Sequence, residues 1–423
     1  MSKKIGILTY YWPPAGGSGV LRWLRFSNEL VALGYDIHIF TFKNPKYPII
    51  DKELIKSVNP NIKVNLISGF ELPNFLSLRN TKPSESFLTP DYTDISLNYI
   101  LSNFLLIVRE LFFFPDTRKY LVVPSVKYIS NYLKKNKLDC LITTGPPHSL
   151  HNIGRILKEK KKIRWIADFR DPWSNFFQNK LLNRLNSTQK KHEEKERQIV
   201  KSSDAVFTTS KSLKNLFQEV NKNSFCIHSG YDKLIRSKPH NKFRILYAGS
   251  LKAIQNPKNL WLALSDLIDK NNEFKDLVEI VLIGNIDSEI LSCSSFKKVE
   301  NRKILSYMSK SDLNKEISIS EVLVVCSVNI KGCDDIIPGK FFHYLSSNKK
   351  ILGITNKESD LKKIINETQS GMSFSYNNYT DLKNYIYQCF YEYKNGKDKK
   401  VIADKEFLSS NIAKKISKIL LKL

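Results

Sequence analysis

The sequence lacks the features that mark secreted and membrane-spanning chains. Its six cysteines form no CxxC pair, and Cys140 and Cys326 lie in or next to apolar, strand-like runs, so reduced thiols in a cytosolic protein are expected. No uninterrupted run of about 18 apolar residues occurs, so no membrane span is predicted. Residues 5–12 follow two lysines but are too few for a signal peptide, and no small-residue cleavage site follows them.

Acidic residues are scarce relative to basic ones, 41 against 67, which gives a formal charge of +26. Such an excess favours polyanions or an anionic membrane surface. Biased codon usage also produces it, and the lysines are spread along the chain rather than gathered in one block. No helix-turn-helix, zinc or RRM signature accompanies the charge, so nucleic acid is not a predicted partner. A nicotinamide dehydrogenase is disfavoured because residues 16–19 lack the GxGxxG spacing and no acid follows the strand at 36–42.

Strand-like and helical segments alternate along the chain, as they do in parallel α/β sheets. With 423 residues, two to three domains are expected. The alternation covers residues 1–220, weakens over a linker at 221–242, restarts over 243–398, and leaves 399–423 as a C-terminal helix that can pack back on the first domain. The sequence therefore predicts an α/β fold with two Rossmann-like domains facing each other across a cleft, the default ligand site.

The first predicted helix begins with Ser18 as its N-cap and stops before Gly34. Residues 44–95 are irregular, with short elements only. The segment 97–114 is the most hydrophobic helix candidate, either a core helix of the first domain or an amphipathic surface that meets a bilayer. The remaining predicted helices are 123–135, 148–160, 190–201, 258–270 and 338–347, and the strands after the first are 36–42, 139–145, 164–168, 205–209, 243–248, 278–283, 321–326 and 351–354.

Two segments carry most of the functional signal. In residues 5–19, an apolar strand and Pro13-Pro14 precede glycines that open a helix. This order places a flexible loop and unpaired helix N–H groups beside the end of a buried strand, where open α/β sheets bind nucleotides and phosphates. An ordinary tight turn is the alternative.

The second segment is 334–345, where Pro338 fits the first helical position and places Lys340 in the opening turn. A cation there opposes the positive end of the helix dipole. An anion such as a diphosphate, lying between the ammonium and the free N–H groups, would remove this conflict. A solvated lysine that points away from the helix end is the alternative.

On these residues the chain resembles the retaining glycosyltransferases of the GT-B type, in the large family 4-like (group 1) set that builds bacterial surface polysaccharides from nucleotide sugars. The resemblance covers almost the whole chain. It rests on five short motifs in the expected order: YWPPAGG at 11–17, ITTGPPHS at 142–149, DFRDPW at 168–173, YAGS at 247–250 and IPGKFFHYL at 337–345.

The resemblance implies transfer of a sugar, with retention, from a nucleotide-sugar donor to a saccharide or lipid-linked acceptor of lipopolysaccharide, capsule or O-antigen. The first domain would bind the acceptor and the second the donor. Basic side chains and helix N-termini would hold the diphosphate, so no cofactor and no metal are implied. A cytoplasmic enzyme in peripheral contact with the inner face of the anionic cytoplasmic membrane is expected.

Site residues follow by motif. The candidate catalytic residues are His148, placed near the reacting sugar with His151 competing for the role, and Asp335, expected to accept a hydrogen bond from the donor sugar. The candidate acceptor contacts are Asp168 and Arg170, which share one face of an extended segment, and Trp173, for which a core role is the alternative. The candidate donor-binding residues are Gly16, Gly17, Gly249, Ser250, Lys252, Lys258, Gly339, Lys340 and His343.

The chain departs from the family pattern in one place. Related enzymes carry two glutamates eight positions apart around the donor, and Asp335 and His343 stand at those positions. His343 replaces the carboxylate that holds the ribose hydroxyls, and an imidazole accepts only one such bond. A weakly active or inactive homologue is therefore one alternative. A nucleotide-sugar epimerase of the same architecture is the other, although the acid/base carboxylates that it needs cannot be placed.

Overall fold

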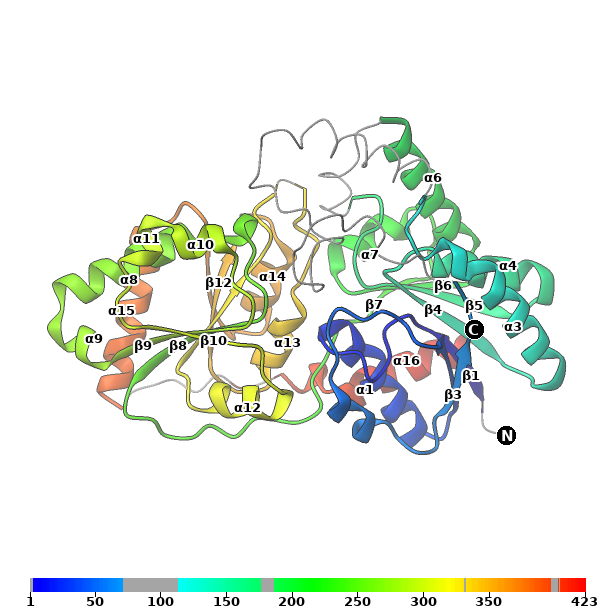
Figure 1. Cartoon of the computed structure of the whole chain (residues 1–423), viewed down its shortest axis with the longest axis horizontal. Helices are drawn as coiled ribbons and strands as arrows, with labels where there is room; N and C mark the ends of the chain where they lie inside the picture. Colours follow the sequence, from blue (N-terminus) through cyan, green and yellow to red (C-terminus); the bar gives the residue numbers. More distant parts are fainter. Residues whose placement is uncertain (1–2, 71–112, 176–185, 331, 397–401, 403) are drawn as a thin grey trace. The chain divides into compact units, whose positions relative to one another are not determined.

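The computed structural model describes residues 3–70, 113–175, 186–330, 332–396, 402 and 404–423. The chain forms two compact units: the first comprises Met1–His228 together with Ser409–Leu423, and the second comprises Ser229–Leu408. The chain thus leaves the first unit inside the segment 221–242 and returns to it for its last helix (Figure 1).

The first unit is built on a parallel sheet in the order β3-β2-β1-β4-β5-β6-β7. Pairing is parallel throughout, with Ile7 of β1 opposite both Ile39 of β2 and Ile142 of β4. The five central strands are short apolar runs buried on both faces, as expected for a parallel sheet, whereas the edge strand β3 is mostly exposed. The strands are β1 (Lys4–Leu8), β2 (Asp36–Phe42), β3 (Lys63–Ile67), β4 (Cys140–Gly145), β5 (Arg164–Phe169), β6 (Ala205–Thr208) and β7 (Ser224–Cys226).

Helices cover both faces of this sheet. On one face, Trp23 and Phe26 of α1 share a buried cluster with Ile412 and Ile416 of α16, and Figure 1 shows the red helix α16 beside the blue helix α1. On the other face, Ile153 of α4 belongs to a second cluster. The helices are α1 (Ser18–Ala32), η1 (Lys52–Ser57), η2 (Lys119–Leu121), α3 (Val122–Lys135), α4 (Leu150–Lys161), α6 (Asn186–Ser202), α7 (Lys211–Gln218) and α16 (Ser409–Lys422).

The second unit repeats this plan with a parallel sheet in the order β10-β9-β8-β11-β12-β13. Its strands are β8 (Phe243–Ala248), β9 (Val278–Ile283), β10 (Arg302–Leu305), β11 (Val322–Cys326), β12 (Lys350–Thr355) and β13 (Gly371–Ser375). Its helices are η3 (Ala253–Gln255), α8 (Lys258–Lys270), α9 (Asn272–Leu277), α10 (Ser288–Ser292), α11 (Ser294–Lys297), α12 (Lys310–Ser318), α13 (Gly339–Leu345), α14 (Asp360–Glu367), α15 (Thr380–Lys394) and η4 (Lys405–Phe407).

At two helix starts the predicted cap position is wrong by one residue, although the first helix does begin at Ser18 as predicted. Gly17, with φ 90°, is the N-cap of α1, and Ser18 is already its first helical residue. Pro338 is the N-cap of α13 rather than its first helical residue, so Lys340 is the second residue of that helix. The stop at Gly34 is confirmed, because this glycine takes φ +88° immediately after Leu33, the C-cap of α1.

Three further expectations concern cysteines and membrane segments. No disulfide joins the six cysteines, all of which lie within the described residues. Within the described ranges, no helix is both long and apolar enough to span a bilayer. The predicted helix at 97–114 falls, except for its last two residues, outside the part of the chain that the structure describes.

In each sheet the strand order reverses at one point, between β1 and β4 in the first unit and between β8 and β11 in the second. Connections leave the two strands at such a point toward opposite faces, which opens a crevice at their carboxyl ends. The loops that follow β1, β4, β8 and β11 are therefore the places where ligand-binding residues are expected.

Candidate functional site

In the second unit, the reversal point brings a glycine backbone against Lys340. Gly249 follows β8 with φ +113°, and a Cβ on it would lie 3.0 Å from the Lys340 Nζ. Gly284 follows β9 with φ +112°, and a Cβ there would lie 2.9 Å from the Gly249 carbonyl oxygen. Two glycines are thus required by their backbone conformation and by the close approach of their neighbours.

Lys340 lies against Tyr247 of β8. Its Nζ donates a hydrogen bond of 2.6 Å to the Tyr247 hydroxyl and lies 3.8 Å from the centre of that ring. The Tyr247 hydroxyl in turn donates to the Ser250 carbonyl oxygen at 2.7 Å. Lys340 contacts both the ring and the hydroxyl of Tyr247, and that hydroxyl is fixed by the Ser250 carbonyl oxygen, so the side chain of Lys340 has a defined position.

The ammonium of Lys340 is poorly solvated. Burial lowers the pKa of Lys340 to about 7, and the nearby thiol of Cys326 opposes this shift only in part. Among the described residues, no carboxylate forms an ion pair with it. Lys340 is half-buried, and a partly desolvated cation without a counter-ion is costly, so an anion at this point would be favoured.

The remaining predicted donor residues of this unit lie on the same loops. Ser250 directly follows Gly249 and is exposed, as is Lys258 at the first residue of α8. Lys252 is half-buried and precedes η3. Gly339 is the first residue of α13. Neither Lys252 nor Lys258 takes part in the contact between Lys340 and Tyr247.

His343 lies one turn after Lys340 on α13 and is held by a residue of α12. Its Nε2 lies 2.7 Å from the Asn314 Oδ1. An amide oxygen only accepts, so the Nε2 of His343 carries the proton in this contact and the Nδ1 of the neutral ring is an acceptor. Asp335 is half-buried in the loop before α13.

In the first unit, Gly16 and Gly17 follow β1 at the corresponding reversal point. The Gly16 N–H donates to the Ile49 carbonyl oxygen at 2.9 Å. Gly17 has positive φ, and the Cβ that it lacks would meet no atom within 4 Å, so the space beside it is open. A Cβ on Gly19 would lie 2.8 Å from the Arg170 Nη1.

Arg170 ties the start of α1 to the end of β4 and to the loop that follows it. Its guanidinium donates to the carbonyl oxygens of Gly19 at 2.6 Å, Gly145 at 3.1 Å and Pro146. Burial lowers the pKa of Arg170, and the carboxylates of Asp171 and Asp168 oppose this. These three bonds use the guanidinium to hold the start of α1 to the end of β4, and Arg170 is half-buried.

Asp168 is completely buried (0% exposed) and does not face solvent. Its carboxylate accepts hydrogen bonds from Arg22 at 2.7 and 3.3 Å, from the Trp23 Nε1 at 2.7 Å and from the Thr144 hydroxyl at 2.7 Å. Burial alone would raise the pKa of Asp168, but the charge and hydrogen bonds of Arg22 hold it below its ordinary value, helped by Trp23 and Thr144. The structure places Asp168 in the interior, where it joins α1 to β4 and β5.

His148, in the loop after β4, stacks on Trp173 with ring centres 5.1 Å apart and planes 3° apart. It is 8% exposed, and its Nδ1 has no hydrogen-bond partner among the described residues. Burial lowers the pKa of His148 well below its ordinary value, as do the charges of His151, Arg170 and His192. His148 is therefore a neutral imidazole at pH 7.

Trp173 and His151 support His148 from the interior. Trp173 is 1% exposed, donates its Nε1–H to the His192 Nδ1 at 2.8 Å, and donates its backbone N–H to Glu196 at 2.9 Å. Trp173 thus lies in the core, which was the alternative to a contact with the acceptor. His151 is completely buried, bonds the Thr143 hydroxyl through Nδ1 at 2.9 Å, and has a pKa that burial lowers to about 3. Because His151 is completely buried, His148 is the more exposed of these two histidines.

Several of these residues were not predicted from the sequence. Arg22 and Trp23 come directly after the glycine loop, and Tyr247 stands inside the YAGS motif, so proximity to a motif was an available signal for them. Asn314 and Glu196 lie in helices far from any motif and gave no signal. Among the described residues, no group of three or more His, Cys, Asp or Glu side chains is arranged to hold a metal ion.

The fold matches solved structures over its whole length. The lipopolysaccharide outer core galactosyltransferase WaaB aligns with 99% of this chain and 99% of its own, at a TM-score of 0.57 and 13% identity. Alr3699/HepE of Anabaena, solved in complex with UDP-glucose, aligns with 99% of this chain and 100% of its own, at a TM-score of 0.60 and 12% identity. A putative UDP-N-acetylglucosamine 2-epimerase of Listeria monocytogenes aligns with 99% of this chain and 95% of its own, at a TM-score of 0.55 and 9% identity.

These matches concern the fold. No protein-family model and no curated protein matches the sequence. The predicted α/β class with two Rossmann-like domains of the GT-B type is confirmed by the two parallel sheets and by the full-length alignments. The resemblance seen in the five sequence motifs is thus confirmed as a resemblance of fold.

Proposed function

We propose that this protein is a glycosyltransferase that moves a sugar from a nucleotide-sugar donor to a saccharide or lipid-linked acceptor, with retention of configuration. The fold, the order of the five motifs and the loops at the two reversal points all support this reading. The contact of Lys340 with Tyr247 beside Gly249 carries the proposal, because it prepares one defined place for an anion.

The donor diphosphate binds at Lys340 in this proposal. Glycosyl transfer breaks the bond between the anomeric carbon and the phosphate oxygen, so negative charge grows on the departing diphosphate while the sugar becomes oxocarbenium-like. A fixed ammonium beside the leaving group stabilises that charge. Ser250, Lys252, Lys258 and Gly339 complete the phosphate site, and the His343 Nδ1 accepts a hydrogen bond from the nucleotide.

The first unit contributes His148 and the glycine loop. Neutral His148, held flat on Trp173, hydrogen-bonds a sugar hydroxyl. Gly16 and Gly17 let the backbone approach the donor, since the space beside Gly17 is open. Asp335 accepts a hydrogen bond from the donor sugar. No metal is needed, because Lys340 and the backbone amides supply the positive charge.

The resemblance and the fold match with WaaB, a lipopolysaccharide outer core galactosyltransferase, support a role in surface polysaccharide synthesis. A product in lipopolysaccharide, capsule or O-antigen fits, with the protein in the cytoplasm and in peripheral contact with the anionic inner membrane surface. The excess of 67 basic over 41 acidic residues supports that contact.

The first test is a thermal-shift screen with UDP, GDP, ADP and their glucose conjugates. A ligand that binds only the folded protein at a hundred times its Kd adds about 2.7 kcal/mol of stability. The best ligand should shift wild-type protein and leave Lys340→Ala unshifted, whereas Lys297→Ala, an exposed lysine of α11, should shift normally. An unchanged shift in Lys340→Ala would remove Lys340 from the donor site.

Product analysis then decides between transfer and epimerisation, since one structure of similar fold is that of a putative epimerase. A glycosyltransferase incubated with its donor and no acceptor slowly releases free nucleoside diphosphate, at a rate that EDTA does not change if no metal is needed. An epimerase returns a nucleotide sugar of altered configuration with its diphosphate intact, and that product would contradict the proposal.

A further inference from the structure

The outward face of helix α3, together with the η2 turn that precedes it, carries charge of one sign. Residues 117–138, which include both elements, contain six basic residues and no acidic one. Leu121 of η2 and Ile129 of α3 belong to the buried cluster on one face of the first sheet. The exposed residues recur at intervals of three or four, as on one side of a helix. They are Tyr120, Val123, Lys127, Asn131 and Lys134, with Tyr128 and Lys135 beside them.

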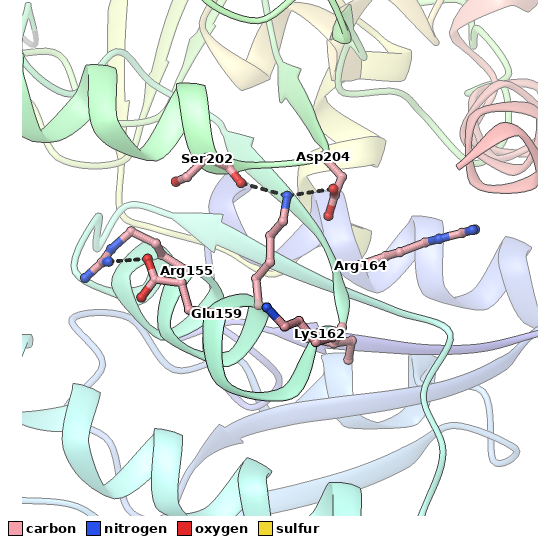
Figure 2. A pocket seen from close by; sticks show the side chains of 8 residues that line it. Arg155, Glu159, Lys162, Arg164, Ser202 and Asp204 are labelled. Atoms are coloured by element: carbon pink, nitrogen blue, oxygen red, sulfur yellow. Dashed lines mark hydrogen bonds and ion pairs between the residues drawn. The ribbon is translucent and has the colours of Figure 1, made fainter.

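The lysines of this surface have no carboxylate partner among the residues that the structure describes. They are Lys119, Lys127, Lys134, Lys135 and, just after α3, Lys137. On the neighbouring helix α4, by contrast, acidic groups accompany the cations. Figure 2 shows Arg155 bonded to Glu159 at 2.6 Å. It also shows the Lys158 ammonium bonded to Asp204 at 2.6 Å. The charge of α3 is therefore left for an external partner.

Apolar side chains protrude at the amino end of α3. Val123 is 76% exposed, Phe70 is 64% exposed, and Tyr120 is exposed as well. Phe70 lies beside this end of the helix, because a Cβ on the preceding residue, Gly69, would lie 2.6 Å from the Leu121 Cδ2. Single exposed apolar residues are ordinary on protein surfaces, but several from two segments gathered at one place indicate an interaction surface.

This end of α3 lies at the carboxyl edge of the first sheet, the edge that carries His148. Gly69 comes two residues after the end of β3 and approaches the first turn of α3. Asp116, which precedes η2, accepts hydrogen bonds from the backbone N–H and the hydroxyl of Ser149, both at 2.8 Å. Ser149 directly follows His148, so the protruding apolar residues and the proposed reaction site share one edge of the sheet.

We propose that the outward face of η2 and α3 docks the protein on an anionic membrane. Phe70, Tyr120 and Val123 enter the interfacial layer, which favours aromatic and apolar side chains, and the lysines lie against the acidic headgroups. Each lysine near such a surface strengthens binding roughly fivefold. A nucleic acid would use the lysines but would leave the exposed Val123 unexplained. The inference rests on the proposed function in one respect: docking at this edge brings a lipid-linked acceptor to His148.

The first test is sedimentation of the full-length protein with vesicles of phosphatidylglycerol or of phosphatidylcholine. At low salt the protein should sediment with phosphatidylglycerol alone, and high salt should weaken this binding because it screens the charges. The triple variant Lys127→Gln, Lys134→Gln and Lys135→Gln should bind phosphatidylglycerol about a hundredfold more weakly than wild type. Glutamine forms helices about as well as lysine, so α3 should remain folded.

The matched control is the triple variant Lys414→Gln, Lys415→Gln and Lys418→Gln. These lysines are also exposed, but they lie on α16, which covers the opposite face of the same sheet. Their replacement removes the same charge and should weaken binding no more than about fivefold.

A second test measures whether position 123 enters the bilayer. Val123→Trp places an indole at this exposed position, and lipids brominated on their acyl chains should quench its fluorescence once the wild-type signal is subtracted. The control Leu421→Trp, at an apolar residue of α16 that is 63% exposed, should not be quenched.

Equal loss of binding in the two lysine triples would show diffuse charge attraction and overturn the proposal. So would equal quenching in the two tryptophan variants, or no sedimentation at low salt. Binding of DNA that requires the lysines of α3, in a protein that ignores vesicles, would make a nucleic acid the partner and contradict the proposal as well. No nucleotide sugar enters these measurements, so their failure would leave the donor site at Lys340 untouched, and failure of UDP to bind would leave the docking surface untouched.

Discussion

Binding of a nucleoside diphosphate should be coupled to proton uptake at Lys340. In the free protein, burial lowers the pKa of Lys340 to about 7. A bound diphosphate supplies the missing counter-charge and returns the pKa toward its ordinary value of about 10.4. At pH 8 only about a tenth of the free protein carries the Lys340 proton, whereas nearly all of the complex does, so about 0.9 proton is taken up per diphosphate.

The affinity should follow the same linkage. Above pH 7 the free protein must first be protonated, so the Kd rises by up to about tenfold per pH unit until the pKa of the complex is reached. Phosphate ionises with a pKa near 6, so the range from pH 7 to pH 9 isolates the lysine. Below pH 7, Lys340 is already charged and contributes little uptake.

Titration calorimetry with UDP in two buffers of different ionisation enthalpy measures the protons directly. Lys340→Arg keeps its charge at every pH used, so it should bind without uptake and with a Kd independent of pH. Lys340→Met should show neither uptake nor tight binding. Wild-type protein that binds UDP at pH 8 without taking up a proton would refute the reasoning, and so would undiminished uptake in Lys340→Met.

Three substitutions test the rest of the site. Gly249→Ala places a methyl group 3.0 Å from the Lys340 Nζ and should weaken donor binding at least tenfold. The control Gly396→Ala, also at positive φ but with no atom within 4 Å, should only lower stability by about 1 kcal/mol. Equal donor affinity in the two variants would count against the close approach of Gly249 to Lys340. Asp168→Asn leaves the buried Arg22 without its carboxylate and should lower the free energy of unfolding in urea by about 3–5 kcal/mol at pH 7. Because folding lowers the pKa of Asp168, this difference in unfolding free energy should shrink as the pH falls below the ordinary carboxylate range. A difference that does not depend on pH would contradict this. His148→Phe keeps the ring stack on Trp173 and removes both ring nitrogens, so kcat should fall about tenfold to a hundredfold with donor affinity unchanged. An unchanged kcat would exclude a hydrogen bond from His148 to the reacting sugar.

The central strands of both sheets could be predicted because they are buried on both faces and read as apolar runs. β4 and β8 are buried at every position and were predicted nearly to the residue. The edge strands β3, β7, β10 and β13 were missed, since their residues are mostly exposed or half-buried and leave no such run.

The site was predictable only where a local pattern carries it. Gly249 and Lys340 stand in motifs, and the strand order brings those motifs together. Asp168 was predicted to face the acceptor because alternation along a strand fixes a face but not what covers that face. Its partner Arg22 is 146 residues away in sequence, and only the folded packing of α1 on the sheet reveals the pair.

The most direct test of the account is a crystal structure of the protein with UDP. The account predicts the diphosphate at the carboxyl end of β8, with a phosphate oxygen within hydrogen-bond distance of the Lys340 Nζ and the backbone of Gly249 against the phosphate. UDP bound away from Lys340, or Lys340 still on Tyr247 with no phosphate beside it, would contradict the claim on which the proposed function depends.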